Sequence, residues 1–216
     1  MFRLNPVAVV VIPGSTGNLT DSRDGQTYKT VTIGSQIWMA ENLNFKTDSS
    51  FCYNNEETNC TKYGRLYTWA AAMDSVGSWS SNGKGCGYSK TCSPTYPVRG
   101  VCPEGWHLPS EDECNTLFTA VGGSSTAGTK LKSTSERFGY RYGYSTDAFG
   151  FSALLAGFKG YNVIYYEKDY YAYFWSSTES GSYNAYYMRI AYNNDDVTLS
   201  DVVDKNRGLS VRCLKG

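Results

Sequence analysis

Seven cysteines place the strongest constraint on how this chain of 216 residues can fold. Cys52 and Cys60 bracket the polar segment YNNEETN, and Cys86 and Cys92 bracket GYSKT. Both segments have the composition of turns, and a disulfide that closes such a loop adds roughly 2–3 kcal/mol by restricting the unfolded chain. Neither spacing is that of a zinc knuckle, and the chain has one histidine, so a structural zinc site is disfavoured. We therefore predict two short-range disulfides and an oxidising, extracellular compartment.

The charge balance limits the partners that the chain can bind. Lys and Arg together number 20, as do Asp and Glu, so the formal net charge is zero. Nucleic acids and anionic membranes both attract basic surfaces, so neither is expected as a partner. No segment has the eighteen or more apolar residues of a membrane span. Aromatic residues make up 15% of the chain and include 19 tyrosines, so we expect a neutral, aromatic binding surface.

Residues 1–22 are predicted to form an extended arm, and residues 23–216 a single domain. The arm holds an apolar run between Pro6 and Pro13 that is too short for a signal-peptide core and is typical of a strand. This assembly strand consists of Val7, Ala8, Val9, Val10, Val11 and Ile12. It can lie in the domain's own sheet or add to a neighbouring copy of the chain, and repeated addition would give a filament.

Short strands, two helices and long loops are expected in the remainder, which is an α+β class. A hairpin with its turn at Gly34-Ser35 is predicted within residues 26–40, and a short helix within 63–76. Residues 77–100 have the composition of a long loop. Further strands are expected at 150–160, 170–180, 185–192 and 208–216, with a polar connection over 193–208.

The segment VCPEGWHLPSEDEC, residues 101–114, combines two cysteines, the single histidine and three acids. Ser110 and Glu113 have the spacing of a capping box, and the acids at 111–113 suit the first turn of a helix. Because the three acids have this ordinary helical explanation, the case for a metal site is weaker. A thiol active site would need His107 with Cys102 or Cys114, and no other nucleophile with a base is evident. We therefore predict that the protein is not an enzyme.

Two further patterns could serve binding. The Tyr-rich run at 161–174 offers rings that can stack on sugars, and its candidate ligand-binding residues are Tyr161, Tyr165, Tyr166, Tyr170 and Tyr171. The polar segment NNDD, residues 193–196, and two later aspartates could supply oxygen ligands to an optional calcium ion. These weak calcium candidates are Asp195, Asp196, Asp201 and Asp204. Sequons at Asn18 and Asn59 permit glycosylation.

Several phrases occur in the order of a known family. They include GQTYKTVTIGSQIWMAENLNF, YGRLYTWAAAM, GVCPEGWHLPSEDE, GFSALLAGF, FWSSTES and GLSVRCLKG. From about Asp24 to Lys215 the chain resembles the Fibrobacter succinogenes major paralogous domain family, which is similar in turn to the C-type-lectin-like superfamily. The resemblance implies a C-type-lectin-like fold with two short helices, small antiparallel sheets and long disulfide-stapled loops. It also implies that the two ends of the domain meet.

The same resemblance implies a third disulfide, Cys102–Cys213, which would leave Cys114 unpaired. Cys114 would then be buried on its helix or exist as a free or intermolecular thiol. The alternative pairs Cys102 with Cys114 and leaves Cys213 odd.

The family name belongs to a cellulose degrader, so adhesion to plant polysaccharide is a reasonable expectation. We expect a non-catalytic, extracellular cell-surface protein with a structural or adhesive role, self-assembling through its N-terminal strand. The alternative is a monomeric polysaccharide-binding module, with calcium as an optional cofactor.

Overall fold

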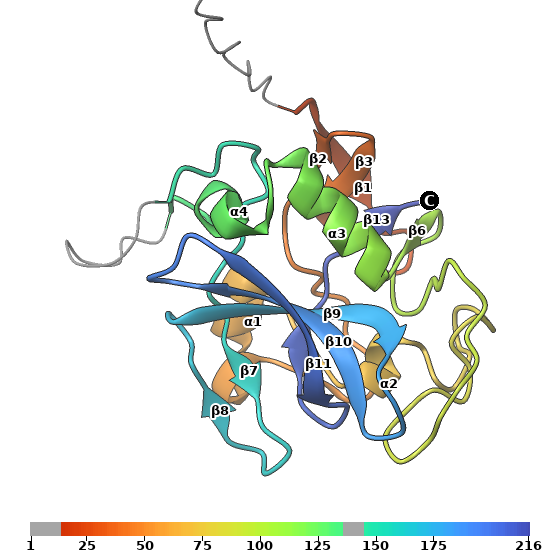
Figure 1. Ribbon diagram of the computed structural model, residues 1–216. Helices are drawn as coiled ribbons and strands as arrows, with labels where there is room; N and C mark the ends of the chain where they lie inside the picture. The colour runs from red at the N-terminus through yellow and green to blue at the C-terminus, as the bar shows by residue number, and fades with distance from the viewer. Residues whose placement is uncertain (1–13, 136–144) are drawn as a thin grey trace, which may run out of the picture.

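The computed structural model describes residues 14–135 and 145–216 (Figure 1). The predicted assembly strand, Val7–Ile12, lies outside the described residues. Among the residues that the structure describes, no helix combines the length and the apolar character that crossing a membrane requires. The described chain mixes α-helices with sheets, which confirms the α+β class.

One sheet joins the beginning and the end of the described chain. Its strands follow the order β1 (Thr16–Thr20), β2 (Thr27–Ile33), β3 (Gln36–Met39), β13 (Leu214–Lys215) and β6 (Trp106–His107). Neighbouring strands are antiparallel, and β2 and β3 form the expected hairpin, in which Gly34 adopts a φ of 60° at the turn. Because β1 pairs with β2, the sheet begins within residues that the sequence assigns to the arm, before the boundary predicted at residue 23.

A second sheet forms the centre of the molecule. In the described residues it has the order β11 (Val197–Asp204), β10 (Asn184–Ala191), β9 (Tyr171–Glu179), β12 (Leu209–Ser210), β5 (Leu66–Tyr67) and β4 (Ser50–Phe51). Only β12 and β9 run parallel; the other pairs of this sheet are antiparallel. The expectation of small antiparallel sheets is therefore wrong at one pair.

Strand β11 corrects the prediction of a polar connection over residues 193–208. Val197 and Val203 are buried, and Leu199 packs against the second core cluster, although Ser200 and Asp201 lie between them. The apolar alternation of a strand was present but masked by charge. The predicted terminal strand at 208–216 is likewise two strands, because β12 and β13 belong to different sheets.

A short hairpin of β7 (Phe158–Lys159) and β8 (Tyr165–Tyr166) lies beside the second sheet and contacts β12 (Figure 1). Residues 150–160 were expected to form one strand, but only Phe158 and Lys159 do so, and most of the segment is irregular.

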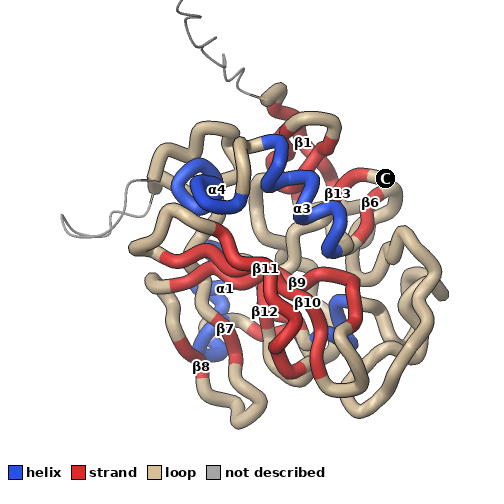
Figure 2. Tube along the Cα trace, in the orientation of Figure 1, coloured by secondary structure: helices blue, strands red, loops and turns tan. Residues whose placement is uncertain are grey.

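The described residues form four α-helices rather than the two expected. They are α1 (Glu57–Tyr63), α2 (Trp69–Ala72), α3 (Glu111–Ala120) and α4 (Ser124–Leu131), with a 3-10 turn at Tyr53–Asn55. The helix predicted over 63–76 is wrong in extent because Gly64, with a φ of 73°, ends α1, and the chain enters β5 before Thr68 caps α2. The residues between α2 and β6 form the predicted long loop (Figure 2).

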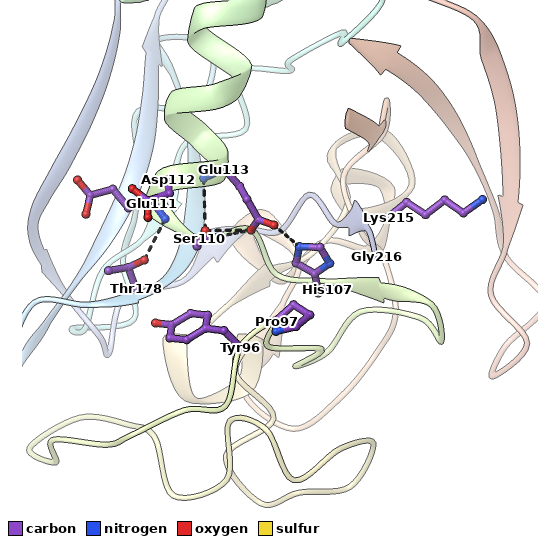
Figure 3. Close-up of a pocket in the computed structure, with 10 residues that line it drawn as sticks. All are labelled: Tyr96, Pro97, His107, Ser110, Glu111, Asp112, Glu113, Thr178, Lys215 and Gly216. Atoms are coloured by element: carbon purple, nitrogen blue, oxygen red, sulfur yellow. Dashed lines mark hydrogen bonds and ion pairs between the residues drawn. The ribbon is translucent and has the colours of Figure 1, made fainter. Parts of the chain in front are cut away.

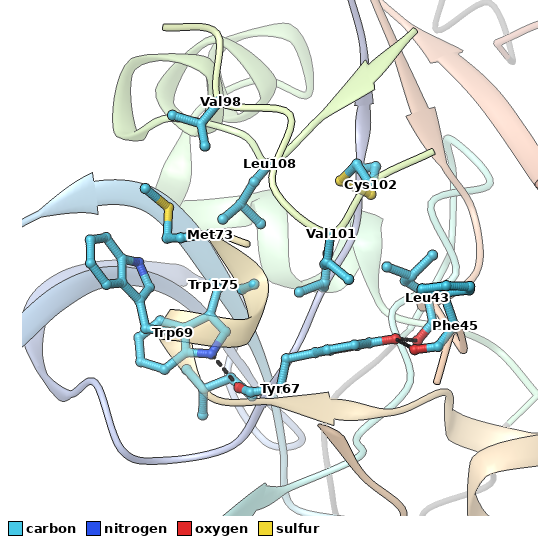
Figure 4. Packing of buried hydrophobic residues seen from close by; sticks show 14 of the residues in the cluster. Leu43, Phe45, Tyr67, Trp69, Met73, Val98, Val101, Cys102, Leu108 and Trp175 are labelled. Atoms are coloured by element: carbon cyan, nitrogen blue, oxygen red, sulfur yellow. Dashed lines mark hydrogen bonds between the residues drawn. A yellow bond between two sulfur atoms is a disulfide. The ribbon is translucent and has the colours of Figure 1, made fainter. Parts of the chain in front are cut away.

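Two hydrophobic clusters lie on opposite faces of strand β9. The first contains Tyr67, Trp69 and Trp175, and the Trp175 indole donates to the Tyr67 carbonyl at 2.7 Å (Figure 4). The second contains Phe174 and Leu117 and lies under α3 and α4. Successive residues of a strand point to opposite faces, so β9 serves both clusters.

The described chain contains three disulfides, and these are the pairs expected above: Cys52–Cys60, Cys86–Cys92 and Cys102–Cys213. The third joins the end of the long loop to the segment between β12 and β13. Cys114 is the free cysteine of the described residues and is buried on α3.

Candidate binding cleft and aromatic ladder

A cleft of about 730 Å³ opens beside the first turn of α3 (Figure 3). Its walls come from four separate parts of the chain: the long loop, the β6–α3 segment, the end of β9 and the last two residues. The lining residues are Tyr96, Pro97, His107, Ser110, Glu111, Asp112, Glu113, Thr178, Lys215 and Gly216. Its volume lies within the range of small-molecule sites in proteins.

Helix α3 positions the centre of the cleft through its capping box. The Ser110 hydroxyl accepts a hydrogen bond from the Glu113 N–H, and the Ser110 N–H donates a hydrogen bond of 2.8 Å to Glu113 Oε2. His107 Nε2 lies 2.8 Å from Glu113 Oε1, so the carboxylate holds the imidazole and the helix start together. Burial alone would raise the pKa of Glu113, but the hydrogen bonds and charge of His107 and the Ser110 hydrogen bonds lower it below its usual value.

The second nitrogen of His107 is left without a partner. The residue is 6% exposed, and Nδ1 is buried and has no hydrogen-bond partner among the described residues. Figure 3 shows this nitrogen on the side of the ring that faces Gly216. Because Nε2 binds a carboxylate, it carries a hydrogen, and Nδ1 is the ring nitrogen whose hydrogen-bonding capacity is unused.

The opposite end of the cleft is acidic and aromatic. The Thr178 hydroxyl accepts a hydrogen bond of 2.9 Å from the Glu111 N–H. This bond connects the end of β9 to the start of α3. The carboxylates of Glu111 and Asp112 have no ion pair within the described residues. Tyr96 lines the same cleft near Thr178 and is 51% exposed (Figure 3). This end therefore offers acceptors and an open ring.

The thiol dyad considered from the sequence is not formed in the structure. Cys102 is oxidised in its disulfide with Cys213. Cys114 is buried, and burial, with a smaller contribution from the charges of Glu113 and Glu111, raises the pKa of its thiol to about 12. A nucleophilic cysteine must be a thiolate, so neither residue suits that role beside His107.

An aromatic ladder crosses from the β7–β8 hairpin onto the second sheet. We define it as Tyr166, Phe158, Tyr173, Tyr171 and Tyr187. The Tyr166 ring stacks on Phe158 with 5.2 Å between the ring centroids. The Phe158 and Tyr173 rings pack in a T-shaped arrangement with their centroids 5.3 Å apart. Tyr173 then contacts Tyr171 at 5.7 Å and Tyr187 at 5.9 Å. The ladder lies on the face of β9 opposite Phe174, away from α3 and α4.

Two guanidinium groups border the ladder. The Arg189 guanidinium lies 5.5 Å from the centre of the Tyr171 ring, and that of Arg207 lies 5.0 Å from Phe158. Tyr173 donates its hydroxyl hydrogen to Glu167. The rings therefore have both donors and an acceptor close to them, an arrangement that suits a ligand rich in hydroxyls.

The five tyrosines predicted to bind a ligand do not share one surface. Tyr166 and Tyr171 belong to the ladder. Tyr165 points to the other side of β8, where its hydroxyl donates to Asn55 at 2.7 Å, and Tyr170 packs against Tyr192. Tyr161, 69% exposed, lies in the loop between β7 and β8. The run spans a loop, two strands and a turn, and neighbouring strand residues such as Tyr165 and Tyr166 point to opposite faces.

The four aspartates named as calcium candidates do not come together. Asp195 and Asp196 precede β11, whereas Asp204 ends it, and eight strand residues span roughly 25 Å. Asp195 accepts a hydrogen bond from the Thr129 hydroxyl, and Asp201 accepts one from the Ser180 hydroxyl. Within the described residues, the one group spaced to share a metal is Cys52, Glu57 and Cys60, and its cysteines form a disulfide.

The two sequons differ in accessibility. Asn18 is exposed on β1. Asn59 is buried in α1, and its Nδ2 donates to the Tyr53 carbonyl at 2.9 Å and to Glu56. The folded protein therefore has no room for a glycan on Asn59, which corrects that candidate.

Sequence reasoning missed several residues of both surfaces. Phe158, Tyr187, Arg189 and Arg207 were not singled out, although Tyr187 and Arg189 alternate along a recognisable strand and that period was a usable signal. Tyr96 lies in the long loop, and no local pattern connects it to α3.

The fold and the two surfaces define a disulfide-stapled α+β domain with an open cleft at one helix start and an aromatic ladder on its central sheet. The chain belongs to the Fibrobacter succinogenes major domain family, whose model matches residues 31–215. This confirms the family resemblance, with a start seven residues later than expected. Neither the curated proteins nor the solved structures contain a match to the chain. The C-type-lectin-like fold therefore stays a prediction.

Proposed function

We propose that this protein is a non-catalytic, extracellular adhesion domain that binds polysaccharide on its aromatic ladder. The observation that carries the proposal is the continuous contact of five rings from Tyr166 to Tyr187, with two guanidinium groups beside them. Sugar rings present flat C–H faces that pack on aromatic rings, while their hydroxyls need hydrogen-bond donors and acceptors around the edge.

The ladder is held rigidly, which reduces the entropy lost on binding. Tyr173 is mostly buried and fixes the centre of the ladder, and Phe158 and Tyr187 pack against the first core cluster. At the hairpin end, the Asn162 side chain donates to the Tyr166 hydroxyl at 2.9 Å. The rings are therefore arranged before a ligand arrives.

Three disulfides support an extracellular location, because such bridges persist in oxidising compartments. The absence of a suitable thiolate near His107 supports a role in binding rather than in thiol catalysis.

A pull-down on insoluble cellulose and other insoluble plant polysaccharides tests the proposal. Wild type should sediment with at least one of them, and a Tyr166→Ala/Tyr187→Ala variant should stay in solution. A cooperative thermal transition of the variant serves as the folding control. If wild type remains in solution with every polysaccharide, or the double variant sediments as well as wild type, the proposed function is wrong.

A further inference from the structure

The cleft beside α3 is separate from the aromatic ladder and has features of a second binding site. It is bordered by residues that are far apart in the sequence, from Tyr96 to Gly216, and it is open to solvent (Figure 3). The buried Nδ1 of His107 has no hydrogen-bond partner within residues 14–135 and 145–216, and a buried polar atom without one costs about 1–3 kcal/mol. A ligand hydroxyl can either donate to this nitrogen or accept from it, so it suits His107 whether or not the ring is charged.

The charge of the cleft selects among hydroxyl-rich ligands. Glu111, Asp112 and Glu113 carry three formal negative charges, and of these only Glu113 contacts a basic side chain among the described residues, that of His107. Lys215 supplies the one lysine or arginine of the described lining. Phosphates and uronic acids would therefore be repelled at the α3 end, whereas a cationic group would be attracted there.

The exposed ring of Tyr96 adds a second attraction for a cation. Tyr96 lines the same cleft as the α3 acids (Figure 3), and an ammonium group above the face of a tyrosine ring gains about 0.5–1 kcal/mol at an exposed site. The same face can pack against a sugar ring. Within the described residues, an aromatic ring and two carboxylates without an ion pair in one cleft, with an unsatisfied nitrogen further along it, match a molecule with an ammonium at one end and hydroxyls along its length.

We propose that this cleft binds a short saccharide that carries free amino groups. The ammonium lies between Glu111, Asp112 and the Tyr96 ring, and a hydroxyl fills the hydrogen-bonding position at His107 Nδ1. The inference shares the saccharide class of the proposed function but uses different residues, so either can fail alone.

The single histidine of the chain provides a direct probe, because its imidazole signals in NMR can be assigned without ambiguity. We would titrate the protein with three soluble oligosaccharides of equal length: one of glucosamine, one of glucose and one of galacturonic acid. The glucosamine oligomer should shift the His107 signals in a saturable way and bind at least tenfold more tightly than the glucose oligomer. The galacturonic acid oligomer should leave the signals unchanged.

Two variants locate the site without touching the capping box. Tyr96→Ala and Glu111→Gln should each weaken glucosamine-oligomer binding about tenfold, and the exposed Glu104→Gln, outside the cleft, should leave it unchanged. The ladder variant Tyr166→Ala should also bind as wild type does. The proposal is overturned if the His107 signals do not respond, if the neutral or acidic oligomer binds as tightly, or if Tyr96→Ala and Glu111→Gln bind normally. Loss of binding in Tyr166→Ala would also overturn it.

Discussion

At the scale of single residues, Cys114 shows how burial decides the chemistry of a side chain. Its thiol lies in the second core cluster with Leu117 and Phe118, on the inner side of α3. A buried thiol behaves as a small apolar group, and its pKa of about 12 keeps it protonated at neutral pH. The structure therefore favours the buried thiol over the intermolecular one that the sequence left open.

Cys114 should be unreactive until the protein unfolds. Treatment of the native protein with iodoacetamide at mildly alkaline pH should add no label, and treatment in guanidinium chloride should add one label per chain, because the other cysteines are oxidised. Mass spectrometry measures both. Rapid labelling of the native protein, or a covalent dimer that a reductant converts to monomers, would show that Cys114 is accessible.

The charge of Glu113 should make stability depend on pH. Its pKa lies below the ordinary value of 4.5, so its contribution is complete above that pH and is lost as the pH falls through the folded-state pKa. Glu113→Gln keeps the shape of the capping box but removes the charge. It should lower the free energy of unfolding by about 1 kcal/mol at neutral pH.

Urea denaturation of wild type and Glu113→Gln across acidic and neutral pH checks this dependence. The difference between the two proteins should vanish at low pH, and Glu104→Gln, an exposed control, should differ from wild type by less than about 0.5 kcal/mol. A difference that is constant with pH would mean that the charge of Glu113 does not stabilise the fold.

At the scale of elements, the disulfides differ in the length of chain that they close. Cys102–Cys213 closes a separation of 111 residues, and Cys86–Cys92 one of 6. The chain-entropy model gives about 5 kcal/mol for the long loop and about 2 kcal/mol for the short one. Cys102→Ala/Cys213→Ala should therefore lower the urea midpoint clearly more than Cys86→Ala/Cys92→Ala. Equal losses, or the reverse order, would contradict a role for Cys102–Cys213 as the main staple.

The elements that the sequence predicted well are those that local interactions specify. Helix α3 follows from Ser110 and Glu113, and the β2–β3 hairpin from its Gly34-Ser35 turn. The sequence does not predict strand β11 because polar and acidic residues alternate with its buried valines. Its hydrogen bonds with β10 stabilise the strand in the folded chain. The helix predicted within residues 63–76 is shortened to α2 because the residues before it enter β5, whose pairing with β12 is non-local.

At the scale of the whole molecule, the sequence predicts the type of the proposed binding residues but not the surface on which they gather. Tyrosines are the candidates, yet the ladder draws on β7, β8, β9 and β10, and Tyr165 faces away from it. The cleft is likewise built from segments that meet only in the folded chain. The capping box explains Glu113 from the sequence, but its hydrogen bond with His107 and the approach of Tyr96 and Thr178 require the tertiary structure.

The most direct test of the central claim compares two neighbouring tyrosines on opposite faces of β8. Depletion isotherms on insoluble polysaccharide would give the dissociation constants of wild type, Tyr166→Ala and Tyr165→Ala. Removing a stacked ring costs about 1.4 kcal/mol, so Tyr166→Ala should bind about tenfold more weakly, while Tyr165→Ala should bind as wild type does. Equal binding by all three proteins, or a loss confined to Tyr165→Ala, would contradict binding on the aromatic ladder.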